Sequence, residues 1–248
     1  MKHYDVLIVG AGHAGAQLAA TLVQLKFDGS IAVLGEEPEC PYERPPLSKD
    51  YLSGELEFDR MLIRPEGFWA EYGIDMLTGL KVVGVAPGDR QVRCEGGEIF
   101  SYGKLVWAAG GHPRRLDCEG ADLEGIQTVR TKADADAMKA QLDNIQNVVV
   151  VGGGYIGLEA AAVLRKLGKS VCLVEALDRV LARVAGEELS RFFEGYHRKK
   201  GVDIRLNTGV SRFAGKKGGL SGLFSKKAGR VSGVVLSGGE TIPADMVI

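Results

Sequence analysis

Residues 4–15, YDVLIVGAGHAG, decide the fold of the first part of the chain. The β-branched run at 4–9 predicts a buried strand, and the apolar periodic stretch that follows, through about Lys26, predicts a helix. A second strand is expected at 31–34, and Glu36 follows it closely. The order of strand, glycine loop, helix, strand and acid is that of a dinucleotide-binding unit.

The three glycines of this loop have separate physical roles. Gly10 permits a tight turn, Gly12 lets the backbone approach a pyrophosphate, and Gly15 lets the helix pack closely on the sheet. The phosphates are then expected at the helix N-terminus, where free N–H groups favour anions. Glu36 is placed to accept hydrogen bonds from a ribose diol.

A second unit of the same order follows later in the chain. A strand is expected at 147–151, a helix at 155–167 and a further strand at 170–174, which ends beside Glu175. With 35 glycines in 248 residues, chance alone predicts roughly 0.7 matches to Gly-x-Gly-x-x-Gly, so the surrounding elements carry the inference. They occur twice, and we therefore predict two dinucleotide sites. The second glycine set is Gly152, Gly154 and Gly157.

Glu175 indicates which nicotinamide nucleotide the second site prefers. A carboxylate at this place repels the 2′-phosphate of NADPH, so the sequence predicts NADH. Arg179 and Arg183 follow within a few residues. They either weaken this preference or form a solvated surface pair, and the sequence does not decide between the two.

Composition excludes several classes of protein. The net charge of −1 arises from 31 basic and 32 acidic residues, which are well mixed, so we expect no nucleic-acid or anionic-lipid partner. The four cysteines show no metal-ligand spacing and predict reduced thiols and no metal site. No apolar run is long enough for a membrane helix, and no signal peptide is evident. We expect a soluble, cytoplasmic protein, and the sequence does not indicate an oligomeric state.

Beyond the glycine loops, the sequence resembles the FAD-dependent, NADH-using ferredoxin reductases of oxygenase systems, such as the putidaredoxin, rubredoxin and biphenyl dioxygenase reductases. The resemblance implies hydride transfer from NADH to FAD, then single-electron transfer to a [2Fe–2S] ferredoxin. It also implies an α/β fold of two Rossmann-like domains, each with three layers, a parallel sheet and an antiparallel β-meander. The matching strings are PYERPPLSKDYLSG (41–54), LVWAAGGHPRRL (105–116), VVVVGGGYIGLEAAAVL (148–164) and PADMVI (243–248).

The resemblance also implies roles for individual residues. Lys49 aligns with a lysine near flavin N5, Glu159 with its carboxylate partner, and Tyr155 with an aromatic that covers the flavin and moves aside for nicotinamide. Surface or packing roles are the alternatives for Glu159 and Tyr155. The candidate cofactor-binding residues are Gly10, Gly12, Ala14, Gly15, Glu36, Arg44, Pro45, Lys49, Val82, Ala109, Gly110, Arg130, Gly152, Gly154, Tyr155, Ile156, Gly157, Glu175 and Arg183.

Three other functions are the alternatives to this one. A disulfide reductase needs a redox thiol after Glu36, but Cys40 is followed by Arg44 and Pro45 where its partner would stand, so a thiol relay is not expected. Monodehydroascorbate reductases share the proline–lysine segment and remain the nearest enzyme alternative. A redox sensor resembling apoptosis-inducing factor is the alternative from another class.

The resemblance divides the chain into an FAD domain, residues 1–113 and 241–248, and an inserted NAD domain, residues 114–240. The segment at 243–248 is expected as a strand that returns to the FAD domain. The FAD domain then lacks its second segment, so we expect a truncated form of a longer protein. The Gly- and Lys-rich stretch at 215–229 is expected as a hairpin loop, with a basic contact for a ferredoxin as the alternative.

Overall fold

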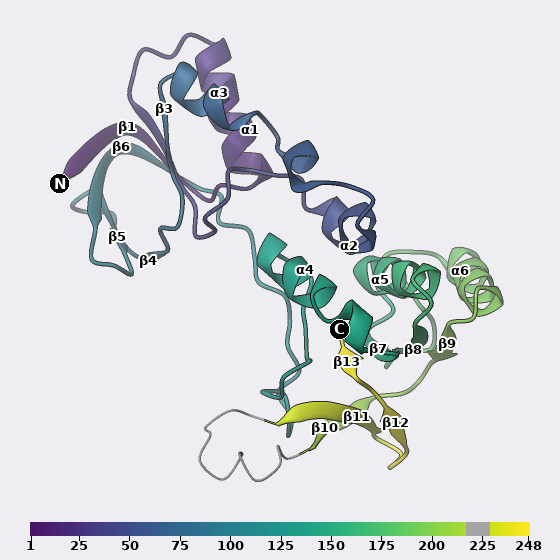
Figure 1. Ribbon diagram of the computed structural model, residues 1–248. Helices are drawn as coiled ribbons and strands as arrows, with labels where there is room; N and C mark the ends of the chain where they lie inside the picture. The colour runs from purple at the N-terminus through teal and green to yellow at the C-terminus, as the bar shows by residue number, and fades with distance from the viewer. Residues whose placement is uncertain (217–228) are drawn as a thin grey trace. The chain divides into compact units, whose positions relative to one another are not determined.

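The chain forms two compact units in a computed structural model (Figure 1). The structure describes residues 1–216 and 229–248. The first unit consists of Met1–Arg44 and Leu56–His112, and the second of Pro45–Glu55 and Pro113–Ile248.

The first unit is built on a six-stranded sheet with the order β3-β2-β1-β6-β5-β4. The neighbours β3, β2, β1 and β6 pair in parallel. The neighbours β6, β5 and β4 pair antiparallel and form a meander. The strands are β1 (Lys2–Val9), β2 (Ile31–Leu34), β3 (Ile74–Leu77), β4 (Val82–Ala86), β5 (Gln91–Cys94) and β6 (Ile99–Trp107).

Side chains of β1 alternate between two layers of packing. Val6 and Ile8 pack with residues of α1 (His13–Gln24) and α3 (Glu66–Glu71), whereas Leu7 and Val9 pack in a second cluster with residues of β5 and β6. The parallel strands are therefore covered on both faces, as their continuous apolar sequence predicts. Figure 1 shows α1 and α3 on one side of the parallel strands and the antiparallel strands β4 and β5 on the other.

The strand β6 corrects one sequence-based expectation. The sequence pattern predicts two short strands here, at 98–100 and 104–108. The structure has one strand, whose residues 100–107 pair with β1. A Cβ at Gly103 would lie 2.8 Å from the carbonyl oxygen of Asp5, so this glycine allows close approach of β1 rather than ending a strand.

The second unit combines a parallel sheet of order β13-β7-β8-β9 with an antiparallel sheet of order β10-β11-β12. The strands are β7 (Asn147–Val151), β8 (Ser170–Val174), β9 (Asp203–Arg205), β10 (Val210–Lys216), β11 (Arg230–Leu236), β12 (Thr241–Pro243) and β13 (Met246–Val247). The helices are α2 (Asp50–Ser53), α4 (Lys132–Lys139), α5 (Tyr155–Lys166) and α6 (Glu187–Lys199), and the 3₁₀-helices of the chain are η1 (Pro45–Ser48), η2 (Phe58–Met61) and η3 (Leu142–Asn144).

The parallel sheet of the second unit lies between a helical layer and the antiparallel sheet. Val148 and Val150 of β7 pack with α5, whereas Val149 packs with β10 and β11 through residues such as Phe213 and Val234. Figure 1 shows α4, α5 and α6 on one side of this sheet and β10–β12 on the other. The predicted three-layer α/β architecture, with parallel strands and an antiparallel meander, is therefore confirmed.

The structure groups two segments differently from the sequence-based domain layout. The strand β13 pairs in parallel with β7, with Met246 opposite Val148 and Val247 opposite Val149. All four side chains are buried. Residues 241–248 therefore lie in the second unit here. Pro45–Glu55 also lies there, since Leu52 belongs to the core around α5. Most of the 215–229 stretch lies outside the described residues.

Candidate functional site

The second glycine loop joins β7 to α5 and has two tight positions and one open position. Gly152 has a φ of +110°, and a Cβ on Gly157 would lie 2.1 Å from the carbonyl oxygen of Gly152. A Cβ on Gly154 would meet no atom of the described residues within 4 Å. The tight pair holds α5 against β7, and the bare face of Gly154 leaves room for a ligand at the backbone.

The first glycine loop, between β1 and α1, repeats this arrangement. Gly10 has a φ of +116°, and its Cβ would lie 2.1 Å from the carbonyl oxygen of Ala108. A Cβ on Gly15 would lie 2.0 Å from the carbonyl oxygen of Gly10, whereas one on Gly12 would meet nothing within 4 Å among the described residues. Both loops thus present an open glycine next to a glycine that close packing requires.

The starts of α1 and α5 leave backbone N–H groups without side-chain caps. Gly12 and Gly154 are the N-cap residues, and neither first turn contains an acidic side chain. Ala14 is exposed in the first turn of α1, and Tyr155 and Ile156 are exposed in the first turn of α5. Uncapped N–H groups beside an open glycine can bind the pyrophosphate of a dinucleotide. The residues of each loop therefore fit a bound dinucleotide.

The two acidic residues that follow the second strands differ in how firmly they are held. Glu36 is exposed, with one carboxylate oxygen 3.8 Å from the Lys81 ammonium. Glu175 is half-buried, and its carboxylate accepts hydrogen bonds from the backbone N–H groups of Gly153 at 2.7 Å and Leu177 at 2.8 Å. Glu175 is therefore fixed against the glycine loop, whereas Glu36 is accessible on the surface of the first unit.

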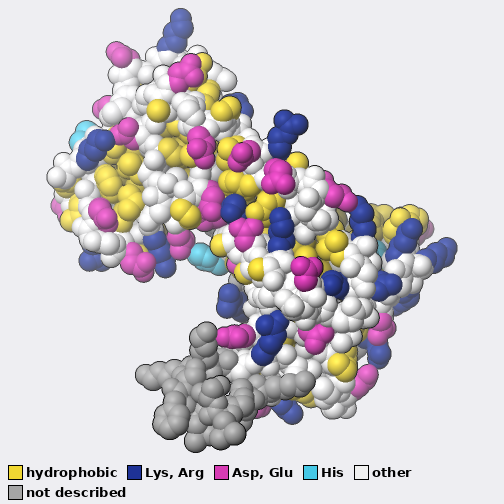
Figure 2. All heavy atoms as spheres, in the orientation of Figure 1, with side chains coloured by type: hydrophobic (Ala, Val, Ile, Leu, Met, Phe, Trp, Pro, Cys, Tyr) yellow, Lys and Arg dark blue, Asp and Glu magenta, His cyan; other side chains and the backbone are white. Residues whose placement is uncertain are grey.

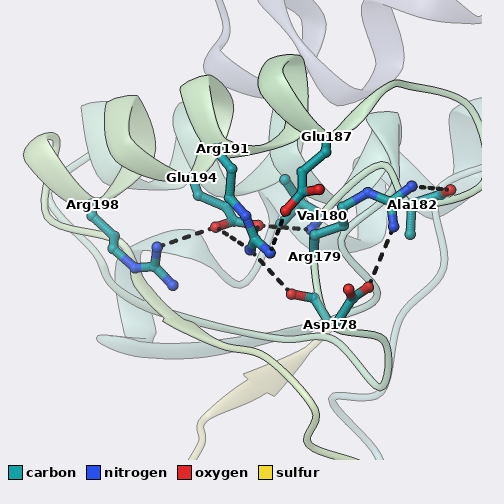
Figure 3. Close-up of polar contacts among 8 residues, drawn as sticks. All are labelled: Asp178, Arg179, Val180, Ala182, Glu187, Arg191, Glu194 and Arg198. Atoms are coloured by element: carbon teal, nitrogen blue, oxygen red, sulfur yellow. Dashed lines mark hydrogen bonds and ion pairs between the residues drawn. The ribbon is translucent and has the colours of Figure 1, made fainter.

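Two hydrogen bonds hold the loop after Glu175, and the one to α6 is drawn in Figure 3. The buried carboxylate of Glu194 on α6 accepts from the Val180 backbone N–H at 3.2 Å, and Leu181 donates its N–H to the Gly153 carbonyl at 2.8 Å. The structure thus connects α6 with the glycine loop through two buried residues, Val180 and Leu181. This connection was not evident from the sequence, since Glu194 reads as an ordinary helix acid.

The two arginines in this loop lie in different environments. Arg179 donates to the Ala182 carbonyl at 3.1 Å and pairs with Asp178 at 3.4 Å (Figure 3). Arg183 is exposed, and its side chain makes no hydrogen bond or ion pair within the described part of the chain. Arg179 is thus occupied within the loop, which leaves Arg183 as the arginine able to respond to a ligand.

The proline-rich segment of the first unit ends in a compact ion pair. Arg44 contacts a carboxylate oxygen of Glu37 at 2.5 Å, and the Tyr42 hydroxyl donates to the other oxygen at 2.5 Å. The Arg44 guanidinium also lies 5.1 Å from the centre of the Tyr42 ring. The segment is therefore ordered by its own side chains, and Arg44, a predicted FAD contact, is already positioned.

The remaining predicted FAD contacts are scattered over both units. Val82 is half-buried at the start of β4, and Ala109 and Gly110 are exposed just after β6. Pro45 opens η1 in the second unit, and the backbone N–H of Arg130, in the same unit, donates to Asp134 Oδ2 at 2.9 Å. Their role as FAD ligands is a prediction.

Lys49 and Glu159, far apart in the sequence, are brought together in the second unit. The Lys49 ammonium lies 3.0 Å from Glu159 Oε1, and the side chains are 41% and 30% exposed. The buried Ser48 hydroxyl donates to Glu159 Oε2 at 2.7 Å. Serine is a common N-cap residue, which predicts Ser48 as the N-cap of a short helix beginning at Lys49. This prediction is wrong, because Lys49 is the N-cap residue of α2 and Ser48 ends η1.

This three-residue group stands one helical turn from Tyr155, since Glu159 is four positions further along α5. One oxygen of the Glu159 carboxylate faces a fixed hydroxyl and the other a cation. The carboxylate is thus oriented by Ser48 and neutralised by Lys49. The sequence identified Lys49 and Glu159 by resemblance only, and it contained no signal for the hydrogen bond between Ser48 and Glu159.

The four cysteines are free, and the environment of each suppresses ionisation of its thiol. Burial, then the charge of Glu66, raises the pKa of Cys40, and burial with the nearby Asp203 carboxylate raises the pKa of Cys172 to about 12. Among the described residues no group of three or more His, Cys, Asp or Glu side chains could hold a metal. No helix in the described part of the chain could span a membrane.

Replacing Cys40 by serine is therefore expected to leave the rate of flavin reduction unchanged within about twofold, because a protonated thiol is a poor nucleophile. The measurement is the rate of flavin reduction by NADH in the holoprotein, before and after treatment with iodoacetamide. If either the substitution or the alkylation abolished activity, the result would support a thiol relay, which the sequence does not predict.

Two dinucleotide-binding loops, one in each unit, define a protein of the two-nucleotide oxidoreductase class. The family model for pyridine nucleotide-disulphide oxidoreductases matches residues 4–248, and the chain belongs to this family.

Known relatives agree with this assignment. The chain is 56% identical to a ferredoxin–NAD(P)(+) reductase of Sphingomonas sp., over 99% of this chain and 57% of the relative. It is 53% identical to the ferredoxin reductase subunit of 5,5'-dehydrodivanillate O-demethylase of Sphingobium sp., over 100% of this chain and 58% of that protein. The solved covalent complex of putidaredoxin reductase with putidaredoxin matches with a TM-score of 0.89 and 35% identity, over 100% of this chain and 57% of that one. The chain thus spans a little over half the length of these relatives.

Proposed function

We propose that the protein is an NADH-dependent ferredoxin reductase, which transfers a hydride from NADH to FAD and then single electrons to a [2Fe–2S] ferredoxin that feeds an oxygenase. The observation that carries the proposal is the Lys49–Glu159 ion pair at 3.0 Å, beside the open glycine loop at the start of α5. The names of the relatives support the choice of acceptor, because both curated relatives described above are ferredoxin reductases.

The residues divide the work between the two nucleotides. The loop around Gly12 and the Glu36 carboxylate would hold FAD, and the loop around Gly154 with Glu175 would hold NADH. FAD, when bound, supplies the exchange between a two-electron donor and a one-electron acceptor. The Lys49 ammonium offers a positive charge beside the nicotinamide loop, and Glu159, oriented by Ser48, keeps that ammonium in place.

The environment of the protein follows from its thiols and charge. Its cysteines are free, as in proteins of a reducing compartment, so we propose that it works in the cytoplasm. Figure 2 shows basic and acidic side chains interspersed over the visible face, without an expanse of one sign. This mixture favours a small protein partner over nucleic acid or an anionic membrane surface.

Replacing Glu175 by alanine is expected to improve the use of NADPH relative to NADH by about tenfold, since it removes a carboxylate that repels the 2′-phosphate. The same change should weaken NADH binding, because Glu175 also accepts the Gly153 and Leu177 N–H groups. The measurement is kcat/KM for flavin reduction by each nucleotide.

Arg183→Ala serves as the matched control for this experiment, because Arg183 is exposed in the same loop without a partner among the described residues. In contrast to E175A, R183A should lower the use of NADPH and leave the use of NADH unchanged. A nucleotide preference that E175A does not alter would disprove the role of Glu175. Equal use of both nucleotides by the unmodified protein would disprove the NADH assignment itself.

A further inference from the structure

The helix α6 presents polar residues to the interior and aromatic residues to solvent. Ser190, Glu194 and His197 are buried. The outward side carries an apolar surface that we call the α6 stripe, made of Leu189, Phe192 and Tyr196, which are 48%, 64% and 52% exposed. Figure 2 shows hydrophobic atoms gathered over α6 at the edge of the molecule. Phe193, which is half-buried, packs against the core, so the aromatic side chains of α6 divide between the core and the solvent.

The orientation of α6 is set by the buried carboxylate of Glu194 (Figure 3). Its oxygens lie 3.1 Å from Arg191 Nη1 and 3.4 Å from Arg198 Nη1, and one of them accepts the Val180 N–H at 3.2 Å. Arg191 and Arg198 belong to α6 and would turn with it, but rotating the helix to bury the stripe would break the hydrogen bond from the Val180 N–H to the buried carboxylate, which is destabilising. The exposure of the stripe is therefore built into the fold of the second unit.

The stripe is a contiguous surface rather than a set of isolated side chains. The rings of Phe192 and Tyr196 are 6.3 Å apart and stacked at 20°, and Phe193 meets Phe192 edge-on at 5.9 Å. Contiguous exposed apolar surface of this kind marks a contact site. Two large aromatic side chains also supply the anchors on which most interface energy depends.

Charged and small residues around the stripe are arranged symmetrically along the helix. Glu188 lies one turn before Phe192, and Lys199 lies one turn after Gly195. Along the helix, the pair Glu188 and Lys199 therefore has the same midpoint as the pair Phe192 and Gly195. Both charged side chains are exposed and make no ion pair within the described residues. A Cβ on Gly195 would meet no atom of the described residues within 4 Å, so the helix surface has an open space at Gly195, which we call the Gly195 notch.

This symmetry identifies a partner for the stripe. When two identical helices pack antiparallel about a twofold axis, residues equally distant from the midpoint face each other. Glu188 of one copy then faces Lys199 of the other, and Phe192 faces the Gly195 notch. The spacing of four, three and four residues from Glu188 to Lys199 is that of a helix–helix seam.

We propose that two copies of this chain associate through their α6 helices, antiparallel, with Phe192 of each copy seated at Gly195 of the other and with two Glu188–Lys199 ion pairs. A contact of 13 residues extends for only about 20 Å, so the association is weak and depends on concentration. It does not depend on the proposed electron-transfer function, since no nucleotide takes part.

The test is sedimentation equilibrium of the purified protein over a range of concentrations, with four variants. Glu188→Lys and Lys199→Glu should each raise the dimer dissociation constant by about tenfold, because each replaces two attractive contacts with two repulsive ones. The double exchange E188K/K199E should return it to within about threefold of the original value. Phe192→Ser should remove the dimer at every concentration reached.

A matched control separates specific pairing from net charge. Glu71→Lys makes the same charge change on the exposed end of α3 in the first unit and should leave the dissociation constant unchanged. Far-ultraviolet circular dichroism of each variant verifies the fold. A protein that is monomeric throughout, a dimer that survives Phe192→Ser, or a double exchange weaker than both single variants would each overturn the proposal.

Discussion

Replacing Gly157 by alanine is expected to destabilise the second unit by at least about 3 kcal/mol, because the new methyl group would overlap a backbone atom. The new Cβ would lie 2.1 Å from the carbonyl oxygen of Gly152, which is a backbone atom and cannot move aside as a flexible side chain could. The helix α5 would have to move away from β7 and would loosen the core formed by Leu158, Ala161 and Leu164. The measurement is thermal unfolding, with an expected fall in Tm of roughly 10 °C.

The matched variant is Gly154→Ala, which adds the same methyl group three residues earlier. Its backbone lies in the extended region that any residue adopts, and the methyl group would meet none of the described atoms within 4 Å. We expect an unchanged Tm and a loss of NADH affinity of at least about tenfold, since the methyl occupies the face that a pyrophosphate approaches. Normal NADH binding by G154A would contradict the nucleotide site, and a normal Tm for G157A would contradict the close packing.

Replacing Lys49 by methionine is expected to slow flavin reduction by NADH by about 100-fold, the usual size of effect when one preorganised electrostatic group is removed. The stability of the protein should change little, because the Lys49–Glu159 pair is partly exposed. Glu159→Gln keeps the shape of the side chain but removes its charge and should give a smaller decrease, about tenfold. The measurement is stopped-flow reduction of the flavin at saturating NADH.

A second lysine–glutamate pair in the same unit supplies the control. Lys166 on α5 pairs with Glu55, just after α2, and both side chains are more than half exposed. Lys166→Met removes a pair of the same type without touching Glu159 or Tyr155. Equal slowing by K49M and K166M would show that Lys49 acts only through general electrostatics or stability, and it would remove Lys49 from the proposed mechanism.

The sequence predicted the parts of the fold that depend on local rules. Strands β1, β2, β7 and β8, and helices α1 and α5, begin and end within a few residues of the expected positions, because apolar periodicity and glycine loops are local signals. The sequence could not indicate that Gly103 permits strand pairing or that β13 joins β7, since both depend on neighbours distant along the chain.

The candidate site shows the same division. The glycine loops and Glu175 could be placed from spacing, and Lys49 with Glu159 from resemblance. Ser48 and Glu194 could not, because their importance lies in one long-range hydrogen bond each, to Glu159 and to Val180. The outward stripe of α6 was also unpredictable, since periodicity alone places Phe192 in the core, whereas the hydrogen bond from Val180 holds the opposite face, with Glu194, inward.

Electron transfer from NADH through FAD to a ferredoxin can be followed in one spectroscopic measurement. The absorbance of the FAD-loaded protein is followed in air after addition of one equivalent of NADH, with and without a [2Fe–2S] ferredoxin. We predict rapid bleaching of the flavin by NADH and rapid return of its colour only when ferredoxin is present. A protein that holds no FAD, or whose reduced flavin persists equally with and without ferredoxin, would contradict the account.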